Sequence, residues 1–241
     1  MKKINFKSRI IAHRGIHNNL DIPENSIKSF KEAIKQKLPI EFDVQLTKDN
    51  KIIIFHDYNL KRMTNLDEEI KNKTYQELNN LYLLNTKEKI PTLKEVLKLV
   101  NNQVPLDIEI KGLKKLKLTC ELISKELEEY QGEYIVKSFN PKIVNWFKKN
   151  KPTITTGLLI HHRCGNKKLD PILQSKTIIK YSKPDFIAIS KVLLEKKKFQ
   201  NLTKKYQTMI WTIKNQEEIT KINNNNFYYI CNNLPYKKDS L

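Results

Sequence analysis

The sequence has no hydrophobic run long enough to cross a membrane. No window approaches the roughly 18 uninterrupted apolar residues that a transmembrane helix needs. Residues 1–8 are basic like the start of a signal peptide, but the apolar stretch of about 7–15 residues that should follow is absent. We therefore expect a soluble, cytoplasmic protein without stable membrane insertion.

Cysteine is scarce as well. The three cysteines, Cys120, Cys164 and Cys231, are odd in number, lie far apart and form no CxxC pair. This spacing argues against a disulfide framework and against a structural zinc site. The sequence predicts reduced, structural thiols.

Arginine is the third scarcity. The formal net charge is +19 and the isoelectric point about 9.6, yet only four of the 45 basic residues are arginine. Arginine is the residue suited to bidentate contacts with phosphates and bases, and the lysines here are spread along the whole chain. We therefore expect no nucleic-acid partner, although the positive field can draw in a small anionic substrate.

Short apolar runs rich in Ile, Val and Phe alternate with amphipathic stretches. This alternation predicts βα units and a parallel sheet, and 241 residues suit closure into a TIM-type (β/α)8 barrel of about 250 residues. The expected strands are residues 9–13, 40–46, 52–56, 104–111, 134–139, 153–160, 186–190, 208–213 and 227–231. The expected helices are residues 26–37, 92–101, 116–130, 141–150, 171–181, 196–206 and 216–223.

Nine strands are one more than such a barrel holds. Only residues 47–51 separate the second expected strand from the third, whereas a parallel crossover needs about a dozen residues. These two strands must therefore form an antiparallel hairpin. Residues 60–90 fit neither a strand nor a long helix, so we expect them outside the barrel, with one short helix near residues 75–81.

The hairpin also makes a geometric prediction. A two-residue turn at Asp49 and Asn50 is acceptable turn chemistry, because both residue types tolerate positive φ. This turn would place Asp43 directly across from His56, on the same side of the sheet and about 5 Å away. A slip of one residue in the turn would change the pairing.

Acidic and basic residues crowd the ends of the expected strands. Glu41 and Asp43 lie two residues apart, as do Glu109 and Lys111, so the side chains of each pair share a face of the strand. Helices cover the apolar outer face of a barrel. The shared face is therefore the interior or the upper rim, where barrel enzymes place their sites.

Three carboxylates that converge on one point need compensation. Glu41, Asp43 and Glu109 would repel one another unless a cation lay among them. Oxygen ligands of this kind favour Ca²⁺ or Mg²⁺ over zinc. The alternative is a set of ion pairs with Arg14 and Lys111 that holds no metal.

Two histidines complete the predicted chemistry. His13 and His56 end neighbouring strands, where imidazoles can run acid–base chemistry near neutral pH. Arg14 and Lys111 can hold a phosphate. The set therefore predicts cleavage of a phosphodiester.

An ordered series of short motifs covers nearly the whole chain. The segments are His13-Arg14-Gly15, Pro23-Glu24-Asn25-Ser26, Glu41-Phe42-Asp43-Val44, Thr47-Lys48-Asp49, His56-Asp57, Leu60-Lys61-Arg62-Met63-Thr64, Pro91-Thr92-Leu93, Ile108-Glu109-Ile110-Lys111, Ser138-Phe139 and Trp211-Thr212. In the order and spacing of these motifs, the sequence resembles the glycerophosphodiester phosphodiesterase family.

The resemblance implies a fold and a metal. It implies one barrel domain over residues 1–241, with a small inserted subdomain at about residues 47–104. It also implies one divalent cation, Ca²⁺ or Mg²⁺, bound by Glu41, Asp43 and Glu109.

The resemblance implies a reaction too. The family cleaves glycerophosphodiesters to glycerol 3-phosphate and an alcohol, and the substrate's own glycerol hydroxyl attacks first to form a cyclic phosphate. His13 and His56 receive the acid–base roles, and Arg14 and Lys111 bind the phosphate. Trp211 at a strand end would stack on the substrate, with packing into the core as the alternative.

Several features depart from the family pattern or stay open. Residues 227–235 lack its Gly-Asp-Gly run, which puts the last loop in doubt. Glu24 and Asn25 either cap a helix or contact Arg14. Arg62 and Thr64 are expected to hold the insertion loop. The role of His17 is open, and His161 and His162 are expected to form a surface pair.

Two other functions are compatible with the sequence. One is a catalytically silent phosphate-binding protein on the same fold. The other is a phospholipase D-like activity on lysophospholipids, which would need an exposed apolar groove. Neither the alcohol that is released nor the oligomeric state can be predicted from these residues.

Overall fold

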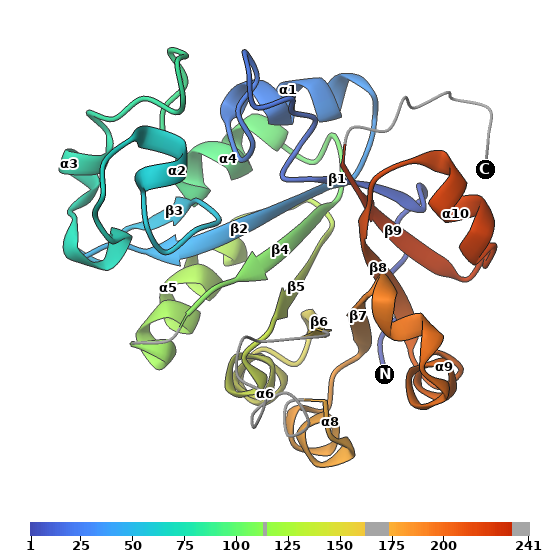
Figure 1. Cartoon of the computed structure of the whole chain (residues 1–241). Helices are drawn as coiled ribbons and strands as arrows, with labels where there is room; N and C mark the ends of the chain where they lie inside the picture. Colours follow the sequence, from blue (N-terminus) through green and yellow to red (C-terminus); the bar gives the residue numbers. More distant parts are fainter. Residues whose placement is uncertain (113–114, 162–173, 233–241) are drawn as a thin grey trace. The chain divides into compact units, whose positions relative to one another are not determined.

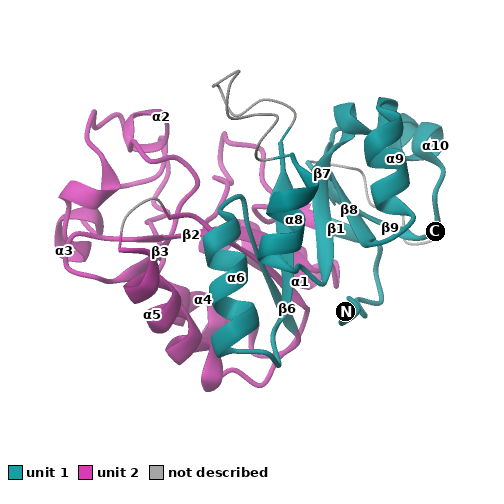
Figure 2. Cartoon of the chain, turned by 90° about the horizontal axis from the view of Figure 1, so that it is seen from below, with its two compact units in different colours: residues 1–11, 134–241 teal, residues 12–133 magenta. Residues whose placement is uncertain are grey.

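The computed structural model describes residues 1–112, 115–161 and 174–232. The chain divides into two compact units (Figure 2), and each is described by itself. Unit 2 comprises Ala12–Glu133, and unit 1 comprises Met1–Ile11 and Tyr134–Leu241. Among the described residues, no helix has the length and apolar character to cross a membrane.

Unit 2 is organised by the strand β2 (Ile40–Leu46). Its first residues pair in parallel with the end of β1 (Ile10–His13), and its other edge pairs in parallel with β4 (Leu106–Ile110). Its last residues pair with β3 (Ile52–Ile54), which runs antiparallel. The expected hairpin of the second and third strands is therefore confirmed (Figure 1).

The alternation along β2 separates apolar from polar side chains. Ile40, Phe42 and Val44 share one face, and the ring of Phe42 lies 5.7 Å from that of Phe30 in the helix α1 (Ile27–Lys35). Alternate residues of a strand point to opposite faces. Glu41, Asp43 and Gln45 therefore share the face turned away from α1.

Side-chain caps fix the helix starts of unit 2. Ser26 and Ser29 form a capping box at α1, and Thr92 and Glu95 form one at α4 (Leu93–Val100). Such reciprocal bonds satisfy backbone amides that would otherwise lack partners. The long helix α5 (Leu116–Glu128) follows β4.

The chain between β3 and α4 has a small core of its own. It contains α2 (Lys61–Thr64), the 3₁₀ helix η1 (Ile70–Asn72) and α3 (Tyr75–Leu78). The sequence predicted only the last of these. They pack around one apolar cluster, formed by Ile53, Phe55, Leu60, Met63, Ile70, Leu78, Leu83 and Ile90.

The described residues of unit 1 include five strands that pair in parallel in chain order. They are β5 (Tyr134–Ser138), β6 (Thr155–Ile160), β7 (Phe186–Ser190), β8 (Gln207–Ile213) and β9 (Phe227–Cys231). The helical elements are α6 (Pro141–Asn150), α8 (Lys176–Ser182), η2 (Lys191–Glu195), α9 (Lys197–Thr203) and α10 (Gln216–Ile222).

The eight strands β1, β2 and β4 to β9 are those of a TIM-type (β/α)8 barrel, as predicted from the sequence. The ninth strand, β3, is the antiparallel partner of β2.

Of the cysteines, Cys120 and Cys231 are buried free thiols. Burial raises the pKa of Cys120 to about 12 and also raises that of Cys231. Cys164 lies outside the described residues.

The predicted register of the hairpin is wrong by one residue. Val44 lies opposite Ile54 and Leu46 opposite Ile52, so the loop has three residues rather than two. The Phe55 amide donates to the Asp43 carbonyl at 3.0 Å, and His56 is therefore not directly opposite Asp43.

The reason for the longer loop is the conformation of Asn50. Its φ is +63°, in the left-handed region that Asn tolerates. Three-residue hairpin loops commonly end on a residue of this conformation. The Thr47 side chain accepts from the Lys51 amide at 2.8 Å and donates to Asp49 at 2.5 Å, which holds the loop closed.

This loop predicts a clear difference between two substitutions. Asn50→Val forces a β-branched residue to positive φ and should lower the free energy of unfolding by about 1–2 kcal/mol. Asn50→Gly should cost little, and so should Lys48→Val, because Lys48 does not have positive φ. Urea denaturation measures all three. An equal loss for Asn50→Val and Lys48→Val would contradict the loop geometry.

Candidate active site

The turn after β1 presents Arg14 in an unusual backbone conformation. Arg14 has a φ of +56° and Gly15 a φ of +77°. A Cβ atom on Gly15 would lie only 2.5 Å from the Ser29 Oγ, so only glycine allows this close approach to α1. The Arg14 carbonyl accepts from the Asn25 amide at 3.0 Å and from the Ser29 hydroxyl at 3.1 Å.

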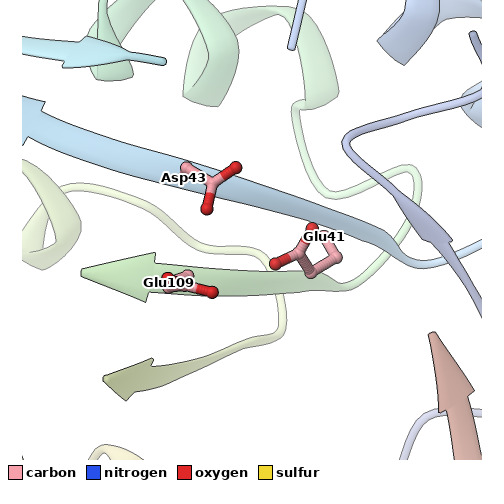
Figure 3. Close-up of side chains that lie close together, drawn as sticks. All are labelled: Glu41, Asp43 and Glu109. Carbon is pink, nitrogen blue, oxygen red and sulfur yellow. The ribbon is translucent and has the colours of Figure 1, made fainter. Parts of the chain in front are cut away.

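Three buried carboxylates meet between β2 and β4. Asp43 lies beside Glu109 in the strand register, and Glu41 precedes Asp43 by two residues on the same face. One oxygen from each of the three lies within 4.8 Å of the others (Figure 3). Their side chains are 1–9% exposed. The convergence predicted from strand alternation is therefore present.

Cations and an amide surround these carboxylates. The Lys111 Nζ lies 2.6 Å from Glu109 and 3.1 Å from Asp43, and the Arg14 Nε lies 3.5 Å from Asp43. The Asn25 side chain donates to Asp43 at 3.0 Å. Burial alone would raise the pKa of Asp43, but Lys111, His56, Arg14 and this hydrogen bond outweigh burial and lower it. Conversely, Asp43 and Glu109 raise the pKa of Lys111 against the effect of burial.

His13 faces the same group. Its Nε2 lies 3.9 Å from the Glu41 Oε2, and the Arg14 amide donates to that oxygen at 3.2 Å. The end of β1 therefore places an imidazole and a backbone N–H donor beside the Glu41 carboxylate.

His56 is held by two residues that sequence reasoning missed. The His56 Nδ1 lies 2.6 Å from the Asp57 Oδ1. The Gln45 amide donates to the carbonyls of Phe55, His56 and Asp57 at 2.9, 3.2 and 2.7 Å. Gln45 lies on the same face of β2 as Asp43, two residues farther on, and this spacing was the available signal. His56 still acts electrostatically on Asp43 despite the shifted register.

Glu24 links two arginines. Its carboxylate lies 2.7 Å from the Arg14 Nη1 and 2.6 Å from the Arg62 Nη2, and it accepts from Asn19 at 3.0 Å. Burial would raise the pKa of Glu24, but Arg62, Arg14 and Asn19 lower it to about 2. Ser26 makes the helix cap, so the contact of Glu24 with Arg14, one of two alternatives left open by the sequence, is the one observed.

Comparison with known proteins decides the family. Residues 13–229 match the model of the glycerophosphoryl diester phosphodiesterase family. The chain belongs to this family. A glycerophosphodiester phosphodiesterase of Caldanaerobacter subterraneus subsp. tengcongensis is 37% identical over 171 residues, which are 66% of this chain and 69% of that protein.

Solved structures agree with the family fold. A phosphodiesterase of Oleispira antarctica in complex with sn-glycerol-3-phosphate superposes with a TM-score of 0.76 at 22% identity and covers 92% of both chains. A glycerophosphodiester phosphodiesterase of Thermotoga maritima gives 0.73 at 24% identity and covers 95% of this chain and 96% of that one. The protein is thus a phosphoric diester hydrolase of the glycerophosphodiester phosphodiesterase type.

Seven of the eight predicted site residues lie in unit 2. They are His13, Arg14, Glu41, Asp43, His56, Glu109 and Lys111. The eighth, Trp211, lies in unit 1 and packs partly buried against the apolar core there. Its ring is 5.6 Å from Phe139 and 5.2 Å from His161.

Two of the remaining histidines are described. His161 is partly buried, and its ring lies near those of Phe139 and Trp211. His162 lies outside the described residues, so the expected surface pair stays a prediction. His17 is also buried, at 8% exposure. Burial lowers the pKa of His17 to about 4 despite the nearby Glu24, so its imidazole is neutral near pH 7.

The depressed pKa of Glu24 predicts a pH-dependent contribution to stability. A carboxyl with a lower pKa in the folded than in the unfolded state stabilises the fold above its unfolded pKa and loses this effect as pH falls through the folded value. Glu24→Gln should therefore cost roughly 2–3 kcal/mol at pH 7, and the cost should shrink between about pH 5 and pH 2.

Urea denaturation at a series of pH values measures this cost. The exposed Glu129 offers a matched control, because Glu129→Gln removes a carboxylate at the end of α5 that is open to solvent. A difference between wild type and Glu24→Gln that stays constant from pH 7 to pH 2 would contradict the role assigned to the Glu24 charge.

Proposed function

We propose that the chain hydrolyses glycerophosphodiesters to glycerol 3-phosphate and an alcohol at the site in unit 2. The observation that carries the proposal is the grouping of three buried carboxylates with Arg14, Lys111 and two imidazoles. A phosphodiester needs cations for its charge and a pair of groups for proton transfer, and this site offers both.

The residues present fit a divalent cation. Glu41, Asp43 and Glu109 offer only hard oxygen atoms, within 4.8 Å of one another, and this donor set favours Ca²⁺ or Mg²⁺. When bound, such an ion would polarise the phosphate and offset its negative charge. Lys111 and Arg14 already lie against these carboxylates and are the residues proposed to bind the phosphate oxygens.

The two histidines are proposed as the proton-transfer pair. Asp57 is ionised, because its bonds to His56 and Arg62 lower its pKa against the effect of burial. An ionised carboxylate can only accept, so in the neutral imidazole of His56 the proton lies on Nδ1 and the lone pair on Nε2, available to the substrate. One histidine accepts the proton of the attacking glycerol hydroxyl as the new P–O bond forms. The other donates a proton to the departing alcohol as the old P–O bond breaks.

The product of this first step would be a cyclic phosphate, which water then opens to glycerol 3-phosphate. Trp211 is proposed to stack on the substrate, a role that stays a prediction, since the ring also packs against the core of unit 1. In the metal-free alternative the three carboxylates form ion pairs only with Arg14 and Lys111, and the alternative reaction is a phospholipase D-like cleavage of lysophospholipids.

Metal removal distinguishes these alternatives. Exhaustive EDTA treatment should abolish turnover of glycerophosphocholine and glycerophosphoethanolamine, and Ca²⁺ or Mg²⁺ should restore it. The reason is that a cation held by the three carboxylates is proposed to align the phosphate. Release of the alcohol measures turnover. Full activity after chelation would contradict the proposed metal dependence. Turnover of lysophosphatidylcholine alone would favour the phospholipase D-like reaction.

Substitution of the histidines tests the proton-transfer pair. His13→Ala and His56→Ala should each lower kcat by roughly 10²–10⁴, the range for loss of a general acid or base. The double variant should lose much less than the product of the single losses, because both groups act on one reaction path. Independent, multiplicative losses in steady-state assays would show that at least one histidine has another role.

A further inference from the structure

Arg62 on α2 lies outside the set of groups assigned to the reaction but is bonded to two carboxylates at once. Its Nε donates to the Asp57 Oδ2 at 2.6 Å. Its Nη2 and Nη1 donate to the two oxygens of Glu24 at 2.6 and 3.1 Å. The guanidinium therefore donates hydrogen bonds to Glu24 from two of its nitrogens and to Asp57 from the third.

Each of these carboxylates bonds a group of the proposed reaction. Asp57 bonds the His56 imidazole at 2.6 Å, and Glu24 bonds the Arg14 guanidinium at 2.7 Å. His56 and Arg14 are thus linked by a chain of charge-assisted hydrogen bonds, and Arg62 is the central residue of that chain. Glu24 is 4% exposed, so its bonds are shielded from competing water.

We propose that Arg62 is a positioning residue that fixes the His56 imidazole and the Arg14 guanidinium relative to each other. This inference rests on the proposed function, because it assigns Arg62 a role in the same site. Residues that bond to and orient directly acting groups commonly affect activity without touching the substrate.

The backbone of α2 has anchors other than Arg62. The Leu60 amide donates to the Glu68 carbonyl at 2.8 Å, and Met63 is buried in the local apolar cluster. The neighbouring Lys61 pairs with Asp67 at 2.8 Å, on the exposed surface. Lys61 therefore offers a control on the same helix that removes one basic side chain and one ion pair.

The shape of the arginine side chain matters as much as its charge. Bonding Glu24 and Asp57 together requires three nitrogens in one plane, which a guanidinium provides and an ammonium does not. In Arg62→Ala, the Asp57 carboxylate keeps only the His56 imidazole among the partners described above, and this carboxylate becomes free to rotate away. The Nδ1–H form of His56 then loses its fixed acceptor.

Nitrogen-15 NMR of the histidines reads this effect without any assay of activity. At about pH 9, where an ordinary imidazole is neutral, wild-type His56 should show one dominant Nδ1–H tautomer. Arg62→Ala should shift its two nitrogen signals towards a mixture of tautomers, whereas Lys61→Ala should leave them in place. Loss of one signal set in His56→Gln assigns the peaks. Unchanged His56 signals in Arg62→Ala would overturn the proposal.

Kinetics supply the second readout. Arg62→Ala should lower kcat/KM by roughly 10–100-fold. Arg62→Lys should restore little of the lost activity, because one ammonium cannot replace the three planar nitrogens of the guanidinium. In the Asp57→Asn/Glu24→Gln background, Arg62→Ala should cause no further loss, since its effect acts through those carboxylates. A full multiplicative loss in that background, or wild-type rates in Arg62→Lys, would overturn the proposal.

The two readouts separate this inference from the proposed function. An inactive wild-type protein would contradict the function, while the His56 signals would still decide whether Arg62 positions the imidazole. Arg62→Lys serves as the NMR variant if Arg62→Ala does not fold, and the same shift towards mixed tautomers is expected.

Discussion

The site depends on mutual compensation between three buried carboxylates and the cations beside them. Glu41, Asp43 and Glu109 have oxygens within 4.8 Å of one another, and at neutral pH they would repel one another strongly if left alone. Lys111 bridges Asp43 and Glu109, so one ammonium reduces the repulsion between neighbouring strands. A divalent ion would add the remaining charge, which is why the same arrangement suits a phosphodiesterase.

A second layer of bonds keeps the groups around this cluster in place. Gln45 holds the loop that carries His56 through three carbonyls, and Asp57 bonds the imidazole itself. Glu24 and Arg62 extend these bonds to Arg14. These residues come from β2, from the segment between β1 and α1, from the residues that follow β3 and from α2.

Much of this could be predicted from the sequence, because strand alternation is a strong local constraint. The period of two placed Glu41 beside Asp43, and the short loop of residues 47–51 required an antiparallel hairpin. The register failed because left-handed Asn50 adds a residue to the turn, which no pattern of apolar residues specifies. The spacing of Gln45 from Asp43 places both on one face of β2, but it does not specify the carbonyls that Gln45 contacts. Those carbonyls, like the partners of Arg62, are set by how the segments after β3 fold back.

Whether the carboxylate cluster binds a divalent ion is best measured by calorimetric titration of the metal-free protein with Ca²⁺ and with Mg²⁺. At least one ion should bind, with a stoichiometry of one per chain. Asp43→Asn should abolish this binding while the exposed Glu129→Gln leaves it intact, because Asp43 is one of the three proposed ligands. No binding of either ion, or binding that Asp43→Asn does not weaken, would show that the cluster is not a metal site.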